Sequence, residues 1–281
     1  LSSRKKASYS SLEDWINNRL GQGISRHFMT PYNKKIWSCP LSEISVGLVS
    51  GKIEPMSLPL FVLSALGWKT IGRKHQSEFV YPRDGIQELM ECTASGIRDR
   101  IRLNSDASQL RKTRGGWEVG GEKFDLVVST IPLPELLKFV SVIKTNGLKW
   151  NSTHFVMVGL KEGRTFGKYH NLHWAFFKGA EIFYRLTFMH SFSSKFPPTV
   201  VAEVTDKGHA GIKDYVLKDL LHNFIIQDFR DIATSVERKV EYTYPIPTVN
   251  TNFLVERIKT ELKKHNLHIL GRSGGWKYIN M

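Results

Sequence analysis

The chain has 281 residues, of which 41% are hydrophobic and 23% are charged. This composition is typical of a soluble globular protein with a substantial core. Lys and Arg number 40 against 26 Asp and Glu, which gives a net charge of +14. No apolar run approaches the roughly eighteen residues of a membrane span, and no tandem repeat or low-complexity tract is present. We therefore expect one large or two moderate domains and no membrane span.

The positive charge attracts anions in general, but the basic residues are dispersed along the chain. Their densest runs, at 4–6 and 263–264, are short. No helix-turn-helix, RNA-binding signature or zinc-finger spacing is present. The sequence therefore predicts a small-molecule substrate, with anionic compounds among the candidates, and no nucleic-acid partner. It indicates no oligomeric state.

Cysteine and histidine are used sparingly. Cys39 and Cys92 are too few for a disulfide framework, which favours a reducing compartment and hence the cytoplasm. The ten histidines are scattered, without the spacing of metal ligands, so that no metal site is predicted. No Gly-x-Ser-x-Gly nucleophile motif is found either. The sequence assigns no catalytic acid or base.

The first third of the chain favours helices. Ser10 and Ser11 precede a helix with Leu12, Trp15 and Ile16 on one face. Residues 28–37 then combine aromatic, amide and cationic groups around a proline. They fit a loop packed by its own aromatic side chains or, alternatively, the wall of a ligand pocket. Residues 46–78 suggest short helices and a loop.

The middle of the chain alternates strands and helices. A helix beginning near Asp84 is followed by strands at 101–104, 107–112, 117–119 and 123–130. The glycine pairs at 115–116 and 120–121 predict hairpin turns between them. The apolar run 124–132 is typical of a strand that is buried on both faces of a parallel sheet. A helix over 133–142 leaves this sheet.

The last part of the chain begins with strands. Those predicted at 155–161, 172–177, 181–189 and 200–205 alternate as in an antiparallel sheet with one covered face. Trp174, Tyr184 and Arg185 either face a ligand or pack and pair within the protein. An amphipathic helix is predicted at 215–229, a strand at 236–244 and a further helix at 252–264.

The final sixteen residues are the most distinctive stretch. A short strand, 268–270, enters the sequence Gly-Arg-Ser-Gly-Gly at 271–275, which is followed by Trp276 and Tyr278. Glycines at a strand end let a ligand approach the backbone closely, and an arginine beside them can bind phosphate or carboxylate. The alternative is a glycine-rich turn with two packed aromatic residues.

This C-terminal stretch resembles the flavin-binding motif Gly-Arg-x-Gly-x-Trp-x-Tyr of the FAD-dependent amine oxidase and protoporphyrinogen oxidase superfamily. It is closest to the branch that resembles UDP-galactopyranose mutase. Residues 28–45, the Tyr-Pro element at 81–82 and the strand end Val-Ser-Thr-Ile-Pro at 128–132 are similar to further stretches of that branch. At the Tyr-Pro element, Asp84 stands where the family has a glycine.

The resemblance implies FAD as cofactor and two groups of binding residues. The cofactor-binding residues would be Gly271, Arg272, Gly274, Trp276, Tyr278, Met281, Ala107, Thr130 and Pro132. The substrate-binding residues would be Tyr32, Asn33, Lys35, Trp174, Tyr184 and Arg185.

The resemblance also implies an α/β fold, made of a partial FAD/NAD(P)-binding, Rossmann-like domain and an α+β substrate domain with an antiparallel or mixed sheet. Residues 1–78 would form the helical part of the substrate domain and 79–132 the middle of the FAD-binding domain. Residues 133–264 would complete the α+β substrate domain, and 265–281 would supply the last strand and flavin motif of the FAD-binding domain.

The Gly-x-Gly-x-x-Gly segment that opens such proteins is not found in the sequence. We therefore expect the middle and late portion of a longer flavoprotein, which binds FAD poorly or not at all in this form. The first functional hypothesis is an FAD-dependent oxidoreductase that transfers hydride from an organic substrate to flavin. The alternatives are a UDP-galactopyranose mutase-like isomerase and a non-catalytic remnant that acts as an interaction module.

Overall fold

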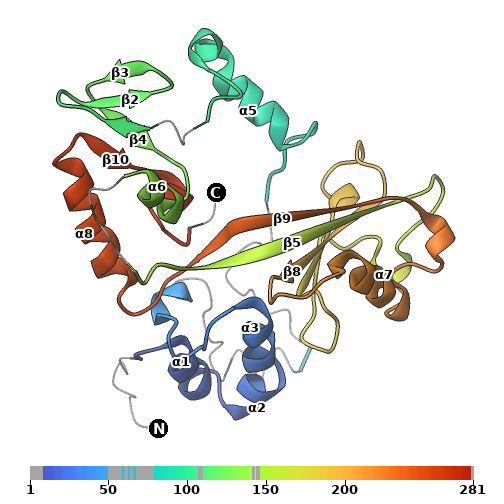
Figure 1. The fold of residues 1–281 in the computed structure, drawn as a ribbon. Coiled ribbons are helices and arrows are strands. Elements are labelled where there is room, and N and C mark those ends of the chain that lie inside the picture. The colour runs from blue at the N-terminus through green and yellow to red at the C-terminus, as the bar shows by residue number, and fades with distance from the viewer. Residues whose placement is uncertain are drawn as a thin grey trace.

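The structure, a computed structural model, describes residues 9–49, 59, 63, 66–67, 79–106, 110–140, 143 and 146–279. Its elements form three groups, each with its own core (Figure 1). No helix in these ranges is long and apolar enough to cross a membrane.

The first group is helical and lies below the central sheet in Figure 1. It contains α1 (Leu12–Arg19), α2 (Gln22–Ile24), a π-helix (Ser25–Met29), α3 (Thr30–Ile36) and a short 3₁₀ helix (Val46–Leu48). The predicted cap of α1 is confirmed, because the Ser11 side chain accepts a hydrogen bond from the Asp14 amide. Leu12 and Ile16 are fully buried against Ile44 and Ile246, so that this core includes a residue from the far end of the chain.

The second group is a five-stranded antiparallel sheet with the order β6-β7-β8-β5-β9. The strands are β5 (Lys149–Leu160), β6 (Trp174–Phe176), β7 (Arg185–Phe188), β8 (Thr199–Thr205) and β9 (Ile232–Ile246). Helix α7 (Ile212–His222) covers one face, where Val200, Ala202 and Val204 alternate inward along β8. The predicted antiparallel sheet is therefore confirmed, but its second face is covered as well near α3, where Thr153, Glu203 and Thr205 are buried.

The third group holds the strands predicted in the middle of the chain. A meander of β1 (Arg111–Lys112), β2 (Trp117–Val119) and β3 (Glu122–Phe124) turns at the two glycine pairs. Strand β4 (Val127–Ser129) pairs in parallel with β10 (Leu267–Ile269), which brings residues about 140 positions apart in the chain side by side. Helices α6 (Leu133–Phe139), α8 (Thr251–Lys263) and the short α9 (Gly271–Gly274) surround this pair.

Three local predictions are wrong. Residues 101–104 form no strand, and 123–130 is divided into β3 and β4 because the chain turns at Asp125 and Leu126. Burial on both faces of β4 is not observed either, since the side chain of Val128 is 51% exposed. Helix α5 (Ile86–Ala94) is formed as predicted, but its apolar residues Ile86, Leu89 and Met90 are exposed. The α/β fold class is confirmed, whereas the domain boundaries stay a prediction.

Candidate functional site

A buried carboxylate, Glu203, organises the polar side chains of the sheet. Glu203 lies on β8, opposite Arg185 of β7 in the strand pairing, and is 3% exposed. Its Oε1 accepts a hydrogen bond from Arg185 Nε at 2.7 Å and lies 2.6 Å from Arg185 Nη2. Its Oε2 accepts a hydrogen bond from the Tyr184 hydroxyl at 2.8 Å. Burying a carboxylate is tolerable here because charged and neutral donors surround it.

The C-terminal motif reaches this carboxylate through Tyr244. Arg185 Nη2 donates to the Tyr244 hydroxyl at 3.1 Å. The Arg272 guanidinium lies 5.1 Å from the ring centre of Tyr244 and 5.3 Å from that of Tyr278, within the range of cation–π contacts. Tyr184, Arg185, Glu203, Tyr244, Arg272 and Tyr278 thus form one connected group, here called the Arg185–Glu203 cluster.

Burial keeps the tyrosines of the cluster in their neutral form. It is the main cause that raises the pKa of Tyr184, Tyr244 and Tyr278. For Arg185, burial lowers the pKa, but Glu203 and the neighbouring tyrosines raise it more, so that its pKa lies above the usual value. The cluster therefore holds two cations, one carboxylate and three neutral hydroxyl groups near neutral pH. This excess of positive charge suits an anion.

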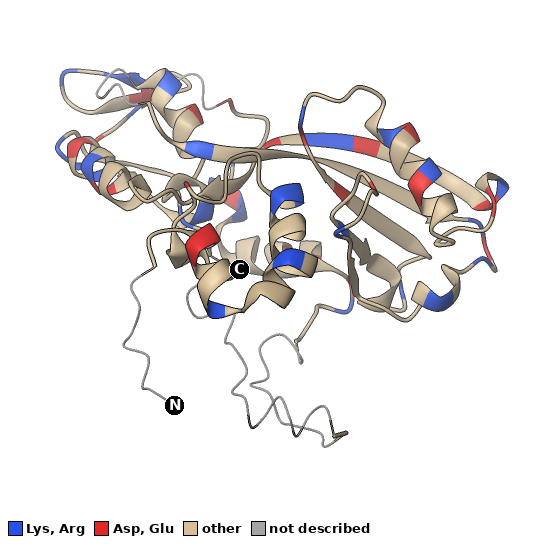
Figure 2. Cartoon of the chain, turned by 90° about the horizontal axis from the view of Figure 1, so that it is seen from below, with Lys and Arg blue, Asp and Glu red and all other residues tan. Residues whose placement is uncertain are grey.

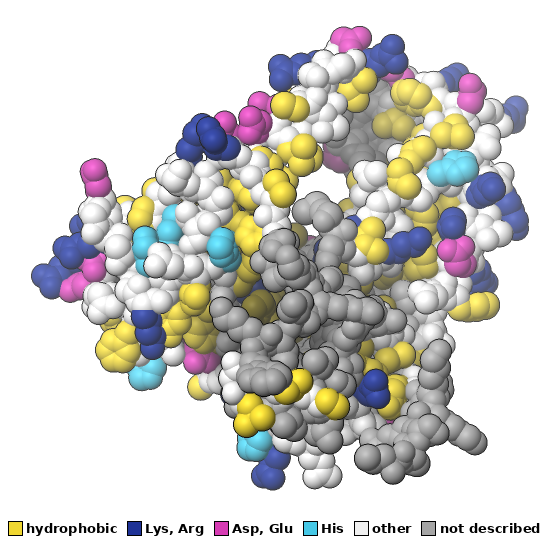
Figure 3. Space-filling model, turned by 180° about the vertical axis from the view of Figure 1, so that it is seen from behind, with side chains coloured by type: hydrophobic (Ala, Val, Ile, Leu, Met, Phe, Trp, Pro, Cys, Tyr) yellow, Lys and Arg dark blue, Asp and Glu magenta, His cyan; other side chains and the backbone are white. Residues whose placement is uncertain are grey.

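An aromatic wall stands beside the cluster. The ring of Tyr32 on α3 stacks on Phe28 at 5.3 Å and meets the edge of Phe176 on β6 at 6.0 Å. Burial raises the pKa of Tyr32, and the charge of Arg185 opposes this shift. Phe176 is 52% exposed. Hydrophobic side chains also gather around a hollow in the middle of the molecule when it is viewed from behind (Figure 3).

The other predicted substrate residues lie apart from the cluster. Asn33 is buried and uses its side chain inside the helix, donating to the Met29 carbonyl and accepting from Trp37 Nε1. Lys35 points to the turn at 179–181, where its Nζ donates to the Gly179 carbonyl at 3.2 Å. Trp174 packs on Phe79 and Phe192 at the other end of β6. Of the six predicted residues, the structure brings Tyr32, Tyr184 and Arg185 together.

Several predicted cofactor residues gather where the parallel strands β4 and β10 end. Thr130 and Pro132 follow β4, and Gly271 follows β10. The carboxyl ends of parallel strands are the usual place for a ligand in open α/β sheets. Gly271 has a φ of +78° and open space where a Cβ would be, so that a ligand can approach its backbone.

The other glycine of the motif has a structural role. A Cβ on Gly274 would lie 2.7 Å from the Ser129 carbonyl oxygen, so that this glycine allows α9 to pack on the end of β4. Trp276 is buried beside Trp150, and its indole Nε1 has no hydrogen-bond acceptor among the described residues. This unsatisfied donor and the open space at Gly271 fit a ligand with acceptor groups. Ala107 and Met281 lie outside the described residues.

Sequence reasoning did not identify Glu203 or Tyr244 as residues of the candidate site. The signal for Glu203 was a single acidic residue inside an otherwise apolar strand, which is rarely tolerated without a partner. Trp37 was assigned to packing or to a pocket wall, and it packs against Tyr244 and Tyr278 with ring centres 6.4 and 5.8 Å apart.

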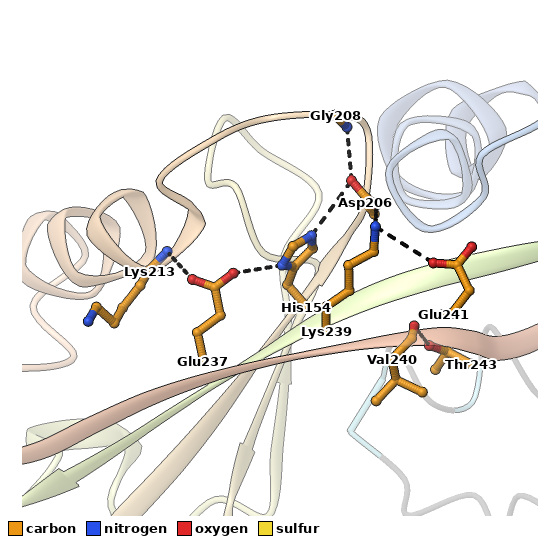
Figure 4. A network of polar contacts seen from close by, with 9 residues as sticks. All are labelled: His154, Asp206, Gly208, Lys213, Glu237, Lys239, Val240, Glu241 and Thr243. Atoms are coloured by element: carbon orange, nitrogen blue, oxygen red, sulfur yellow. Dashed lines mark hydrogen bonds and ion pairs between the residues drawn. The ribbon is translucent and has the colours of Figure 1, made fainter.

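A second polar network lies elsewhere on the sheet (Figure 4). The imidazole of His154 on β5 lies 2.7 Å from Glu237 and 3.6 Å from Asp206. Asp206 also binds Lys239 at 2.6 Å and the Gly208 amide at 2.9 Å, and both contacts lower the pKa of its carboxyl to about 2. These bonds join β5, β9 and the turn after β8. We therefore infer that this network stabilises the sheet.

No model of a known protein family matches the sequence, but solved structures do match the fold. The chain superposes over 98% of its length on reduced UDP-galactopyranose mutase, with a TM-score of 0.82 and 20% identity, and it covers 64% of that chain. It matches a putative protoporphyrinogen oxidase from Exiguobacterium sp. 255-15 over 97% of its length, with a TM-score of 0.69 and 15% identity, again covering 64% of that chain. A CLA-producing fatty acid isomerase from P. acnes matches 84% of the chain at 12% identity, with a TM-score of 0.52 and 55% of that chain covered.

The chain therefore has the fold of the reduced UDP-galactopyranose mutase and of the putative protoporphyrinogen oxidase, which confirms the fold that the sequence resemblance predicted. It spans 64% of the length of the mutase and of the oxidase.

Proposed function

We propose that this chain forms the substrate-facing part of a flavin-dependent enzyme, in which the Arg185–Glu203 cluster binds an anionic substrate beside the flavin. The observation that carries this proposal is the contact of Arg272 and Tyr278, from the flavin-type motif, with Tyr244 of the sheet. Because of this contact, a group held at the motif and a group held on the sheet are neighbours.

In this proposal FAD is held where β4 and β10 end, with Gly271 and Thr130 approaching it through their backbones. When bound, the flavin would supply the redox-active ring. The residues of this chain would bind and orient the substrate: Arg272 and Arg185 attract negative charge, and the hydrogen bonds of Glu203 and Tyr244 hold Arg185 in place. The aromatic wall of Phe28, Tyr32 and Phe176 offers ring faces to a planar group.

A sugar nucleotide combines these features, because it has a charged diphosphate, hydroxyl groups and a planar base. We therefore favour a mutase-like isomerase that acts on a UDP-sugar over the oxidoreductase that the sequence alone put first. Isothermal titration calorimetry with UDP and with uridine tests this choice. We expect UDP to bind, and Arg272→Gln to weaken its binding roughly tenfold through the loss of one charge contact of about 1.4 kcal/mol.

Arg257→Gln is the matched control, because Arg257 is an exposed arginine on α8 that is not in the cluster. It should change the affinity for UDP less than about twofold, as expected for a screened surface charge. Equal losses of UDP affinity in the two variants would show that UDP binding depends only on the net charge of the protein, and the proposal would then fail.

The oxidoreductase remains the second candidate, and the exposed apolar ring of Phe176 in the wall favours it, since an uncharged organic substrate could lie there. Oxygen consumption by the FAD-loaded protein with amines or porphyrinogens, without any effect of UDP, would select this candidate.

A further inference from the structure

A second cavity lies beside α3, apart from the Arg185–Glu203 cluster. It has a volume of about 330 Å³ and opens between α3, the turn that joins β6 to β7, and the turn after β8. Lys34, Lys35, Lys178 and Lys207 line it, and Glu181 is the one acidic residue of its lining. We call this cavity the lysine pocket. Figure 2, seen from the side of α1–α3, shows Lys and Arg on these helices as well as over the rest of the described chain.

The acidic residue of the pocket, Glu181, forms an ion pair with Lys35. The Glu181 carboxylate lies 3.5 Å from Lys35 Nζ, and it folds back over Gly179, where an added Cβ would be 2.8 Å from Glu181 Oε2. Asp219, outside the lining, also acts on Lys35, and its carboxylate accepts a hydrogen bond from the Ile182 amide. Both nearby carboxylates therefore act on Lys35, and none of the other three lysines forms an ion pair with a residue that the structure describes.

Hydrogen bonds to carbonyl groups hold two of these three lysines in place. Lys207 Nζ donates to the Lys34 carbonyl at 3.1 Å, and Lys178 Nζ donates to the His27 carbonyl. An ammonium group has three donors, so that each of these exposed lysines retains donors for a ligand while one bond directs its side chain. The Lys34 ammonium has no hydrogen bond or ion pair within the described ranges. Fixed cations bind an anion with a smaller loss of side-chain entropy than mobile ones.

The positive charges of the lysines in the pocket also act on one another. Burial lowers the pKa of Lys35, the Glu181 carboxylate opposes that shift, and the neighbouring charge of Lys207 lowers the pKa further. Lysines held near one another at the mouth of a cavity raise the local concentration of anions, and a multivalent anion relieves their repulsion best.

We propose that the lysine pocket binds a phosphate-bearing group with two or more negative charges. The site is separate from the substrate site proposed above, because it uses residues of α3 other than Tyr32 and none of the cluster. Its volume falls within the range of small-ligand sites, roughly 300–1,000 Å³. The ligand is either a soluble phosphate compound or the phosphorylated headgroup of a lipid.

Calorimetric titration with inorganic pyrophosphate at physiological salt tests the pocket. The informative variant is Lys34→Gln combined with Lys207→Gln, which removes two uncompensated charges. Because each contact near a protein surface is worth on the order of 1 kcal/mol or more, the affinity should fall at least about tenfold. The control combines Lys213→Gln on α7 with Lys259→Gln on α8, which changes the net charge equally. It should weaken binding less than about twofold.

Three results would overturn the proposal: no pyrophosphate binding by the unmodified protein at millimolar concentration, equal losses in the two double variants, or a loss caused by Arg272→Gln instead. The third result would place the pyrophosphate at the cluster and leave the proposed function intact. Conversely, UDP binding that fails while pyrophosphate binding depends on Lys34 and Lys207 would refute the proposed function alone.

Sedimentation with vesicles of phosphatidylcholine, with and without phosphatidylinositol 4,5-bisphosphate, identifies the source of the phosphate group. Sedimentation that requires the phosphorylated lipid and both lysines supports the pocket with a lipid headgroup as its ligand. Pyrophosphate binding without sedimentation supports it with a soluble ligand. Thermal unfolding of each variant, with transitions close to that of the unmodified protein, confirms that the substitutions leave the fold in place.

Discussion

The substitution Glu203→Gln should be strongly destabilising, although it changes one atom. The carboxylate of Glu203 accepts from the Tyr184 hydroxyl and from two nitrogens of Arg185, and its side chain is 4% exposed. Removing one partner of a buried ion pair costs about 3–5 kcal/mol, because the other charge stays buried without compensation. The Arg185 side chain is 30% exposed, so that water hydrates part of its charge, and we expect the lower value, about 3 kcal/mol.

Urea denaturation followed by tryptophan fluorescence and circular dichroism measures this loss. The matched control is Glu237→Gln, which makes the same chemical change on a neighbouring part of the sheet. Glu237 contacts His154 and the Lys213 amide, but its side chain is 31% exposed, and we expect a cost below about 1 kcal/mol. A cost for Glu203→Gln below 1 kcal/mol, or one equal to the control, would refute the argument that the buried carboxylate holds the cluster together.

Three further predictions concern the fold. Gly274→Ala should destabilise the protein by more than about 2 kcal/mol in urea unfolding, because the new Cβ would lie 2.7 Å from the Ser129 carbonyl oxygen. The control Gly23→Ala, which has open space around the new Cβ, should be neutral or stabilising by up to about 1 kcal/mol. Similar effects of the two substitutions would contradict the close packing of α9. The pKa of Asp206 is about 2 in the folded state, below its unfolded value of about 3.9, so that its contribution to stability is present above pH 4 and is lost as the pH falls towards 2. The stability difference between Asp206→Asn and the unmodified protein should therefore shrink over this range in acid titrations, and a constant difference would be evidence against the ionic contact. Trp117→Phe should cost about 2 kcal/mol of unfolding free energy, because it removes a buried hydrogen bond to the His265 carbonyl and leaves a small cavity; a loss under 0.5 kcal/mol would show that this bond contributes little.

Local patterns predicted most of the regular elements correctly. The hairpin glycines, the serine cap of α1 and the alternation along β7 and β8 act over a few residues, and such short-range signals can be read from one sequence. The boundaries were less accurate: β5 begins at Lys149 and not at 155, and β9 begins at Ile232 and not at 236. Strand ends depend on partners far away in the chain, which the sequence does not name.

The candidate site was predicted in its parts but not in its connections. Tyr184 and Arg185 were chosen from the resemblance, and the C-terminal motif was found from its glycines. Their meeting through Glu203 and Tyr244 depends on strand register, which brings Arg185 opposite Glu203. A shift by one residue would turn each side chain to the other face, so that only the three-dimensional structure could reveal this cluster.

The helical group that contains α1 depends on residues that are synthesised much later in the chain. Ile44 forms a bridge with Thr248, and Ile246 completes the core around Leu12 and Ile16. Strand β4 likewise has no β10 to pair with until the later part of the chain has been synthesised. Such distant pairings require closure of loops of about 140 residues or more before any contact is gained, and this slows folding. During translation, the N-terminal helices therefore leave the ribosome with an incomplete core, and a chaperone that covers apolar surface would have its longest contact with them.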